Sequence, residues 1–454
     1  MAIRLGFDWE NLPDGYRHQT QYIWEHYKLS GSESKGRRQA SDKAKTDVAF
    51  LMTYVATDAY LTPTGKLGFV ITQTGFQSEL GGRAFRRFTL PDDTPLGIVA
   101  VQDMVRIQPF GKEAANRTAV LLLHRGTPLS WPLPYTVWER KPHVQLDSDE
   151  PLATLRGKTN RLDWVGYPIS AHDSLSSWIV GRDVPVSIAR KFVAPSDYKN
   201  IVREGTNTRG ANGVFYIEVV GDSHEDEIVV RNIPSAGRKK IEQETARVDR
   251  KHIYPLLTGR DVRRWIAAPS GRILLPHSPL SPTDPIPESS LRKYDKATYR
   301  FLSKFEGILS KRRKFRNFDP SGGTFYGLYN VGSYTFAPYK VVWREIATDF
   351  MVAPVFPIDM ESGKERVVVP NHKLMMVPVK SKEEALYLAT MLNATISRYT
   401  VLSYTVATQI STHVLNNVNV PQFDETDKVH KSIAALGARP SLPLDRMQQR
   451  RWIR

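Results

Sequence analysis

The feature that most constrains the fold is a helix, a turn and a buried strand in direct succession. Residues 46–61, TDVAFLMTYVATDAYL, place apolar side chains at the helical period. The segment TPTGK then ends the helix with Pro and Gly, and LGFVITQ begins a short apolar run with β-branched and aromatic residues. Such runs are typical of strands in an α/β sheet that is covered on both faces. This succession therefore predicts an α/β domain.

Two more apolar runs extend this domain. LGIVAVQDM at residues 96–104 and RTAVLLLHRG at residues 117–126 have the length and composition of buried strands. Together with the first unit they predict that residues 1–140 form the later part of a sheet whose strands are largely parallel.

Beyond residue 140 the texture of the chain changes. Residues 141–200 are richer in Pro, Asp and Ser and predict a linker. Strand and helix patterns are mixed over residues 201–428, and residues 429–454 predict a loosely ordered basic tail. The expected fold is therefore α/β plus α+β, with a domain on each side of the linker.

The charge indicates an anionic partner. The 454 residues carry a formal net charge of +16. Residues 1–140 hold 17 Lys and Arg against 14 Asp and Glu, whereas the remainder holds 46 against 33. A basic surface concentrates polyanions, so nucleic acid is the leading candidate and the second domain its expected site. The alternative is a generally basic protein whose charge serves solubility.

Several classes of protein are not indicated by the sequence. No apolar run approaches the roughly 18 residues of a membrane span, and the first residues lack the apolar core of a secretory signal. The chain has no cysteine, so thiolate metal sites and disulfides are excluded. We find no phosphate-binding loop, nucleophile elbow or HExxH motif, and therefore predict neither a metal site nor a complete active site.

A basic segment interleaved with aromatic residues spans residues 299–316. Such a pattern suits a surface that follows the phosphates of a nucleic acid. It is equally typical of a solvated amphipathic helix. The candidate phosphate contacts are Lys311, Arg312, Arg313, Lys314 and Arg316.

A glycine-containing loop leads into a predicted strand at residues 206–219, TNTRGANGVFYIEV. It carries Arg209 and Asn212, two residue types that make bidentate contacts with guanine and adenine edges. The glycines also suit a simple turn, which is the alternative interpretation.

Taken together, several segments resemble the C-terminal part of adenine-specific DNA methyltransferases of the gamma class, as found in type IIG-like restriction-modification systems. The likeness covers most of residues 7–423. In chain order, the segments are FDWENLPDGYR, KTDVAFLMTYVATDAYLTPTGKLGFVITQTGFQSELGGRAFRRF, TRGANGVFYIEV, YPLLTGRDVRRW, YNVGSYTFAPYKVVWREI, VVPNHKLMMVP, ALYLATMLNATISRY and THVLNNVNVPQF.

The resemblance implies an incomplete Rossmann-like half-domain followed by a linker and a target-recognition domain. In that family the segment similar to WENLP follows the catalytic tetrapeptide N-P-P-[WYF], but here Ile3, Arg4, Leu5 and Gly6 stand in its place. No Pro-Pro dipeptide occurs in the chain. Methyl transfer requires donor and amine to be held in line. We therefore expect this chain alone to be inactive.

The resemblance also implies partners. Double-stranded DNA would be the substrate, and S-adenosylmethionine would bind only when a separate chain supplies the cofactor loop and the tetrapeptide. A prokaryotic cytoplasm, near the nucleoid, is the expected location. The alternative is a non-enzymatic DNA-binding module left from a truncated methyltransferase gene.

Site residues follow from the same likeness. Phe110 matches the aromatic that stacks on a base turned out of the helix, although a role in core packing is the alternative. The candidates for DNA contact in the target-recognition domain are Arg209, Asn212, Arg260, Arg263, Arg264, Tyr334, Tyr339 and Lys340.

Overall fold

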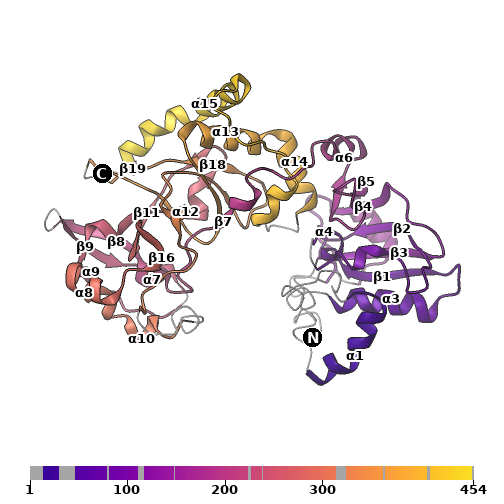
Figure 1. Ribbon diagram of the computed structural model, residues 1–454. Helices are drawn as coiled ribbons and strands as arrows, with labels where there is room; N and C mark the ends of the chain where they lie inside the picture. The colour runs from indigo at the N-terminus through magenta and orange to yellow at the C-terminus, as the bar shows by residue number, and fades with distance from the viewer. Residues whose placement is uncertain are drawn as a thin grey trace. The chain divides into compact units, whose positions relative to one another are not determined.

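The chain forms two compact units. The computed structural model describes residues 14–29, 47–78, 81–110, 117–147, 149–222, 226–237, 239–312, 324–360, 363–405 and 410–451. Unit 1 comprises Met1–Ala194 and Tyr399–Ala407, and unit 2 comprises Pro195–Arg398 and Thr408–Arg454 (Figure 1).

Unit 1 is built on a six-stranded sheet with the order β1-β3-β2-β4-β5-β6. Its strands are β1 (Lys66–Thr72), β2 (Leu96–Asp103), β3 (Thr118–Arg125), β4 (Leu133–Arg140), β5 (Thr159–Pro168) and β6 (Trp178–Gly181). Strand β3 is antiparallel to both β1 and β2, and only the β2–β4 pair of this sheet is parallel. The predicted strands are confirmed, but the largely parallel arrangement is wrong, because apolar runs report burial and not strand direction.

The predicted linker is largely part of unit 1. Strand β5 pairs with β4 along eight residues, from Leu133 opposite Gly166 to Arg140 opposite Thr159. Helices α5 (Leu152–Lys158) and α6 (Asp183–Arg190) lie on either side of β5 and β6 along the chain. Because its backbone pairs with β4, this polar, proline-containing segment continues the sheet.

Among the described residues, unit 1 also contains α1 (Asp14–His26), α3 (Val48–Tyr60), α4 (Thr74–Gln77) and the 3₁₀ turn η3 (Phe85–Arg87). Asp47 caps α3 by accepting a hydrogen bond from the Ala49 backbone N–H at 2.9 Å. The core is rich in aromatic rings: Phe76 stacks on Trp178 with centroids 4.4 Å apart. These contacts join α4 to β6 at the far edge of the sheet.

Unit 2 contains two larger sheets. The six-stranded sheet has the order β10-β9-β8-β14-β11-β21 and the four-stranded sheet the order β18-β17-β22-β7. The strands of the first are β8 (Tyr216–Asp222), β9 (Glu227–Asn232), β10 (Thr245–Asp249), β11 (Ile253–Leu257), β14 (Gly271–Leu274) and β21 (Val369–Pro370). Those of the second are β7 (Arg203–Glu204), β17 (Tyr339–Arg344), β18 (Val352–Val355) and β22 (Leu374–Val379).

Short hairpins and helices surround these sheets. The hairpins pair β12 (Val262–Arg263) with β13 (Ile266–Ala267), β15 (His277–Ser278) with β16 (Ser281–Pro285), and β19 (Ile358–Asp359) with β20 (Glu365–Arg366). The helices are α7 (Asn212–Phe215), α8 (Glu288–Tyr294), α9 (Lys296–Ser303), α10 (Glu306–Leu309), α12 (Ser333–Phe336) and α13 (Lys382–Asn393), followed by α14 (Thr395–Tyr404), which continues into unit 1, and α15 (Lys428–Arg451). The mixed α and β content predicted for this region is confirmed.

The predicted loose tail is wrong, because residues 428–451 form helix α15. This helix packs against α13, and Gly437 lies at a close contact between the two helices. A Cβ atom on Gly437 would lie 2.3 Å from Thr390 Oγ1 and 2.8 Å from the Leu386 carbonyl oxygen. Packing against α13 therefore stabilises a segment whose two prolines argue for an end to the helix.

Candidate nucleic-acid interface

Three distant segments of unit 2 are held side by side around the predicted recognition loop. Asn207 and Tyr329 exchange backbone hydrogen bonds of 2.8 and 2.9 Å. Thr206 N–H donates to the Pro370 carbonyl at 2.8 Å, and His372 N–H donates to the Thr206 carbonyl at 2.9 Å. The loop after β7 is therefore fixed to the segments before α12 and before β22.

Arg209 stands at the tip of this loop in a left-handed conformation, with φ of 52°. The Asn207 side chain accepts its backbone N–H at 2.8 Å, and its guanidinium carbon lies 5.1 Å from the ring centroid of Tyr329. A non-glycine residue in this region costs roughly 1 kcal/mol or more, which the surrounding contacts must offset. The loop thus holds a half-buried arginine in one position.

Charged side chains of both signs surround Arg209. Lys373 Nζ lies 3.1 Å from Glu345 Oε2. Burial and then the nearby charge of Glu345 raise the pKa of Glu204, whereas burial and the charge of Lys373 lower the pKa of His372. We call this group the Arg209 cluster; it comprises Glu204, Arg209, Tyr329, Glu345, His372 and Lys373. It offers hydrogen-bond donors and acceptors together, as the edges of base pairs require.

Asn212, the second residue predicted to contact a base, makes hydrogen bonds within unit 2. Its Oδ1 accepts a hydrogen bond from Thr208 Oγ1, and its Nδ2 donates to the Ala236 carbonyl at 3.2 Å. The amide therefore braces the start of α7. Asn212 is half-buried, and its contact with a base stays a prediction.

The arginines of the YPLLTGRDVRRW segment lie on the surface. Arg260, Arg263 and Arg264 are exposed, around the β12–β13 hairpin. Arg264 Nη2 donates to the Asn393 carbonyl at 2.8 Å. All three remain candidates for contact with phosphate or base.

Two predicted DNA contacts prove to be buried. Lys340, on β17, is 0% exposed, and its ammonium donates to the Ala337 carbonyl. Arg312 is 2% exposed and donates to backbone carbonyls inside unit 2. The expectation of DNA contact for these two residues is corrected, because the side chains are enclosed by the fold. A basic run does not reveal which of its members points inward.

The other members of the basic segment divide into two groups. Lys311 is exposed and remains a candidate. Arg313, Lys314 and Arg316 lie outside the described residues.

The two predicted tyrosines are half-buried. Tyr334 lies under Arg203, whose guanidinium carbon is 5.8 Å from its ring centroid, and burial raises the pKa of Tyr334. Tyr339 packs edge-on against Phe356 at 6.4 Å. Tyr334 is thus close to the loop that carries the Arg209 cluster, whereas Tyr339 starts strand β17.

Unit 1 contains a buried polar network that the sequence reasoning missed. Tyr135 donates to Asp103 Oδ2 at 2.7 Å, Gln73 Nε2 hydrogen-bonds to the same carboxylate, and Arg117 Nε donates to Gln73 Oε1 at 2.8 Å. Burial and then Asp103 raise the pKa of Tyr135 well above its ordinary value, and burial lowers the pKa of Arg117. The available signal was that Gln73 and Asp103 each stand at the end of an apolar run.

This network braces both ends of the loop that carries Phe110. Asp103 Oδ1 accepts the Val105 N–H at 2.9 Å, and Gln73 N–H donates to the Arg117 carbonyl at 2.7 Å. Phe110 itself is 49% exposed. The structure therefore places the predicted stacking residue at the surface of unit 1.

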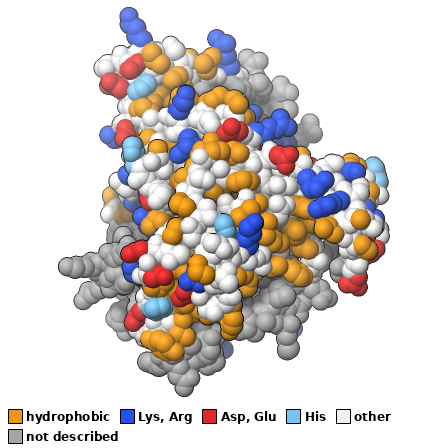
Figure 2. All heavy atoms as spheres, turned by 90° about the vertical axis from the view of Figure 1, so that its right-hand side faces the viewer, with side chains coloured by type: hydrophobic (Ala, Val, Ile, Leu, Met, Phe, Trp, Pro, Cys, Tyr) orange, Lys and Arg blue, Asp and Glu red, His pale blue; other side chains and the backbone are white. Residues whose placement is uncertain are grey.

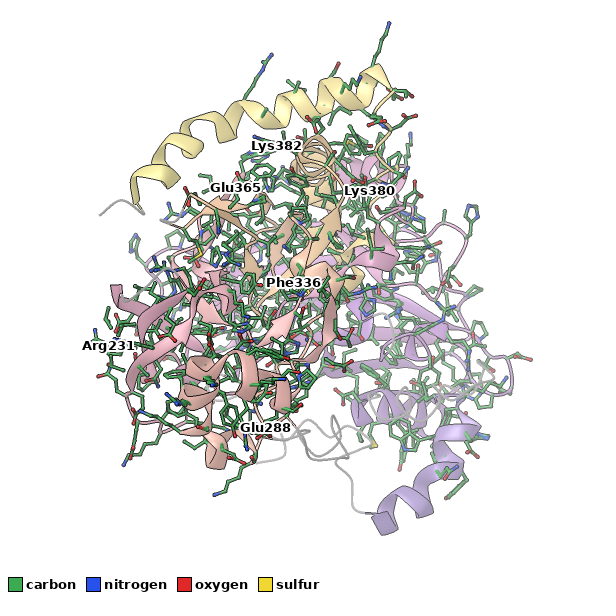
Figure 3. The ribbon with its side chains drawn as sticks, turned by 60° about the vertical axis from the view of Figure 1, so that its left-hand side comes forward. Arg231, Glu288, Phe336, Glu365, Lys380 and Lys382 are labelled. Carbon is green, nitrogen blue, oxygen red and sulfur yellow. The ribbon has the colours of Figure 1, made fainter. Side chains whose placement is uncertain are left out.

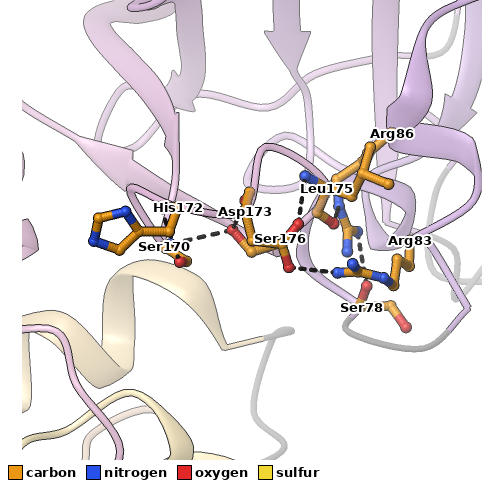
Figure 4. A network of polar contacts seen from close by, with 8 residues as sticks. All are labelled: Ser78, Arg83, Arg86, Ser170, His172, Asp173, Leu175 and Ser176. Carbon is orange, nitrogen blue, oxygen red and sulfur yellow. Dashed lines mark hydrogen bonds and ion pairs between the residues drawn. The ribbon is translucent and has the colours of Figure 1, made fainter.

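Unit 1 contains a second polar network, around Arg86 and Arg83 (Figure 4). Arg86 is 1% exposed and donates to the carbonyls of Gly75, Ser78 and Leu175 at 2.8, 2.7 and 2.9 Å. Arg83 Nη1 lies 2.6 Å from Asp173 Oδ2. These bonds tie the β5–β6 connection to the turn that follows α4, so they serve the fold.

The surface combines apolar and basic side chains. Figure 2 shows apolar patches on the face that it draws, with Lys and Arg side chains between them. Among the described residues we find no cluster of metal-binding side chains and no helix long and apolar enough to cross a membrane.

Solved structures of restriction enzymes share features of this chain. It is similar to the type IIL restriction-modification enzyme MmeI in complex with DNA (12% identity, TM-score 0.42, 88% of this chain and 44% of that one). It is also similar to the type IIG restriction endonuclease BpuSI (12% identity, TM-score 0.30, 94% and 47%). A third is a nuclease-deletion mutant of the type ISP restriction-modification enzyme LlaGI in complex with a DNA substrate mimic (12% identity, TM-score 0.43, 96% and 33%).

The chain thus spans less than half the length of each of these solved chains. No protein-family model and no curated protein matches its sequence.

Proposed function

We propose that this chain is the DNA-binding, specificity-bearing part of an adenine-specific methyltransferase of a restriction-modification system. The observation that carries the proposal is the Arg209 cluster. Three segments far apart in the sequence are joined there by backbone hydrogen bonds, the Arg209 guanidinium lies 5.1 Å from the Tyr329 ring centroid, and its charge acts on the Glu204 carboxylate. Arginine matches the acceptors of guanine, and carboxylates match the amino group of cytosine.

Unit 1 would handle the target base. Phe110 is half exposed on a loop whose ends are fixed by Gln73, Asp103 and Arg117. An exposed ring held in this way offers a base a stacking partner to replace those it loses when it leaves the helix. The alternative core role for Phe110 requires a buried ring.

The methyl-donor site and the tetrapeptide N-P-P-[WYF] would come from polypeptide other than these 454 residues. Strand β1 lies at one end of its sheet, and within the described part of the chain it pairs only with β3. Val70 of β1 is 53% exposed. An apolar strand with a free edge suits pairing with a strand of another polypeptide. S-adenosylmethionine would bind only in that assembly.

Binding of duplex DNA is the first test. We expect fluorescence anisotropy to show an affinity that falls steeply with salt, because phosphate contacts release counterions. Arg209→Gln should reduce discrimination between duplexes of different sequence, whereas Arg264→Gln on the hairpin should weaken all duplexes alike. An affinity independent of salt would contradict the proposal.

Methyl transfer is the second test and separates the split enzyme from a binding module without activity. This chain should transfer no methyl group alone and should do so when a chain with the cofactor loop and the tetrapeptide is added. Absence of both complex and activity with that partner would favour the non-enzymatic module. Methylation by this chain alone would contradict the proposal.

A further inference from the structure

A shallow hollow opens on the six-stranded sheet of unit 2. Its volume is about 330 Å³, part of which is open solvent. Apolar side chains form its floor and arginines its rim. The floor includes Val219, Ile228 and Ile253, and the rim is formed by Arg250, Arg272 and Arg366.

The strand register explains why these residues meet. Arg272 of β14 stands opposite Ile217 of β8, and Val219 follows two residues later on the same face. Ile253 belongs to β11, which pairs with β14 on the other side. Since side chains alternate along strands and paired residues share a face, Arg272 stands above a floor of apolar side chains. The β19–β20 hairpin brings Arg366 to the same hollow.

The third arginine comes from the turn before β11. Arg250 belongs to the run Arg250–His252, and Arg366 Nη1 lies 3.5 Å from the carbonyl of Lys251 in that run. Three guanidinium groups from separate segments thus line one hollow, and Lys251 beside it is exposed. Acidic side chains on the hairpin, Asp359 and Glu365, are exposed as well. Glu365 precedes Arg366 in strand β20, so its side chain points to the face opposite to that of Arg366.

Guanidinium groups bind phosphate through paired, charge-assisted hydrogen bonds. The hollow is open to solvent, so a phosphate group can approach the arginines from outside. An apolar floor next to this group suits the carbon face of a deoxyribose. The chemistry therefore matches one backbone phosphate of a DNA strand lying across the sheet.

We propose that Arg250, Arg272 and Arg366 form a seat for a DNA backbone phosphate. This inference rests on the proposed DNA-binding function and adds a contact region to it. The seat holds the duplex in place without reading its sequence, since phosphates are common to all sequences.

Two variants and a matched control test the seat. Arg272→Gln and Arg366→Gln should each weaken binding about tenfold near 0.1 M salt, as expected for a lost charge-assisted hydrogen bond. The double variant should lower the slope of log affinity against log salt by about 0.9, the value for one phosphate. The fold-loss of affinity in the double variant should be smaller than the product of the fold-losses in the two single variants, because both arginines hold the same phosphate. The loss should be equal for all duplex sequences.

Arg231→Gln is the control. Arg231 lies on the opposite face of the same sheet, where its Nε is 2.6 Å from Glu218 Oε1, and Figure 3 labels it together with Glu365. The change in charge is the same, but the slope should not change. Circular dichroism of every variant checks that unit 2 is folded.

A methylphosphonate duplex provides a measurement that does not depend on variant folding. A neutral linkage is placed at each phosphate position of the duplex in turn. At one position it should lower the affinity of the unaltered chain for the duplex but cause no further loss of affinity in Arg272→Gln. If the chain binds DNA while both variants keep its affinity and its slope, the seat is refuted and the proposed function stands. If the chain binds no duplex at any salt concentration, the proposed function itself fails.

Discussion

Replacing Arg312 by Leu should destabilise unit 2 without removing a DNA contact. The guanidinium is buried and donates four hydrogen bonds of 2.6 to 3.2 Å to backbone carbonyls. The acceptors are Thr208, Leu309, Phe325 and Gly327. Burial lowers the pKa of Arg312 to about 10, so enclosing the charge has a cost that these bonds offset.

The magnitude follows from the carbonyls that lose their donor. A buried acceptor left unsatisfied costs about 1 to 3 kcal/mol. The Thr208 and Leu309 carbonyls keep a backbone donor, the N–H groups of Ala211 and of residue 312, so the loss falls on the Phe325 and Gly327 carbonyls. At about 2 kcal/mol each these two acceptors give about 4 kcal/mol, because leucine removes the charge and its burial cost at the same time. This is a large part of the roughly 5 to 15 kcal/mol that stabilises a domain.

Urea unfolding followed by hydrogen exchange and mass spectrometry is the assay. Peptides of unit 2 should lose protection at a urea concentration about 2 M lower, if the denaturant slope is about 2 kcal/mol/M, whereas peptides of unit 1 should not change. Lys311→Gln is the matched control, since Lys311 is the adjacent, exposed cation. It should leave stability within about 0.5 kcal/mol. An Arg312→Leu chain of unaltered stability but weaker DNA affinity would refute the reasoning.

Three other predictions concern stability. Burial lowers the pKa of Lys340 to about 7, so between about pH 7 and 10 the unfolded state binds more protons than the folded state. The free energy of unfolding should therefore rise with pH more steeply in this chain than in Lys340→Met, and an equal slope in both proteins would contradict this. Burial raises the pKa of Asp173, but the hydrogen bonds from Arg83 and the Leu175 N–H, together with the charges of Arg83 and Arg86, lower it by more, so the net shift is downward. The stabilisation should therefore be present above about pH 4 and fade at lower pH, and Asp173→Asn should cost about 0.5 kcal/mol at pH 7 in thermal unfolding and nothing at low pH. Gly437→Ala should weaken the docking of α15, seen as faster hydrogen exchange in that helix, because its Cβ would clash with Thr390; unaltered exchange would count against the clash.

Local patterns predicted the elements well, and the reason is periodicity. The helix at residues 46–61 and the apolar runs that became β1, β2 and β3 each bury side chains at a repeat that is visible in the sequence. The second region likewise has the mixed strands and helices that its patterns predict. The proposed DNA partner comes from the resemblance of the sequence segments and from the charge of the chain.

Pairing between distant strands decided the rest. Residues 159–168 are part of the sheet of unit 1 because they pair with β4. The local sequence pattern of these residues does not show that this pairing partner exists. The direction of β3 and the helical form of residues 428–451 depend on the same kind of contact. Local composition cannot report such partners.

The roles of the basic residues were also decided in three dimensions. Composition established a basic chain with its excess beyond residue 140. Whether a cation faces solvent or backbone carbonyls depends on which side of a helix or strand is packed: Lys311 is exposed, whereas Arg312 beside it is enclosed. Arg272 and Arg366 are 94 residues apart in the sequence, but both line the same hollow. Charge is a property of the sequence, whereas burial and proximity arise only when distant segments pack together.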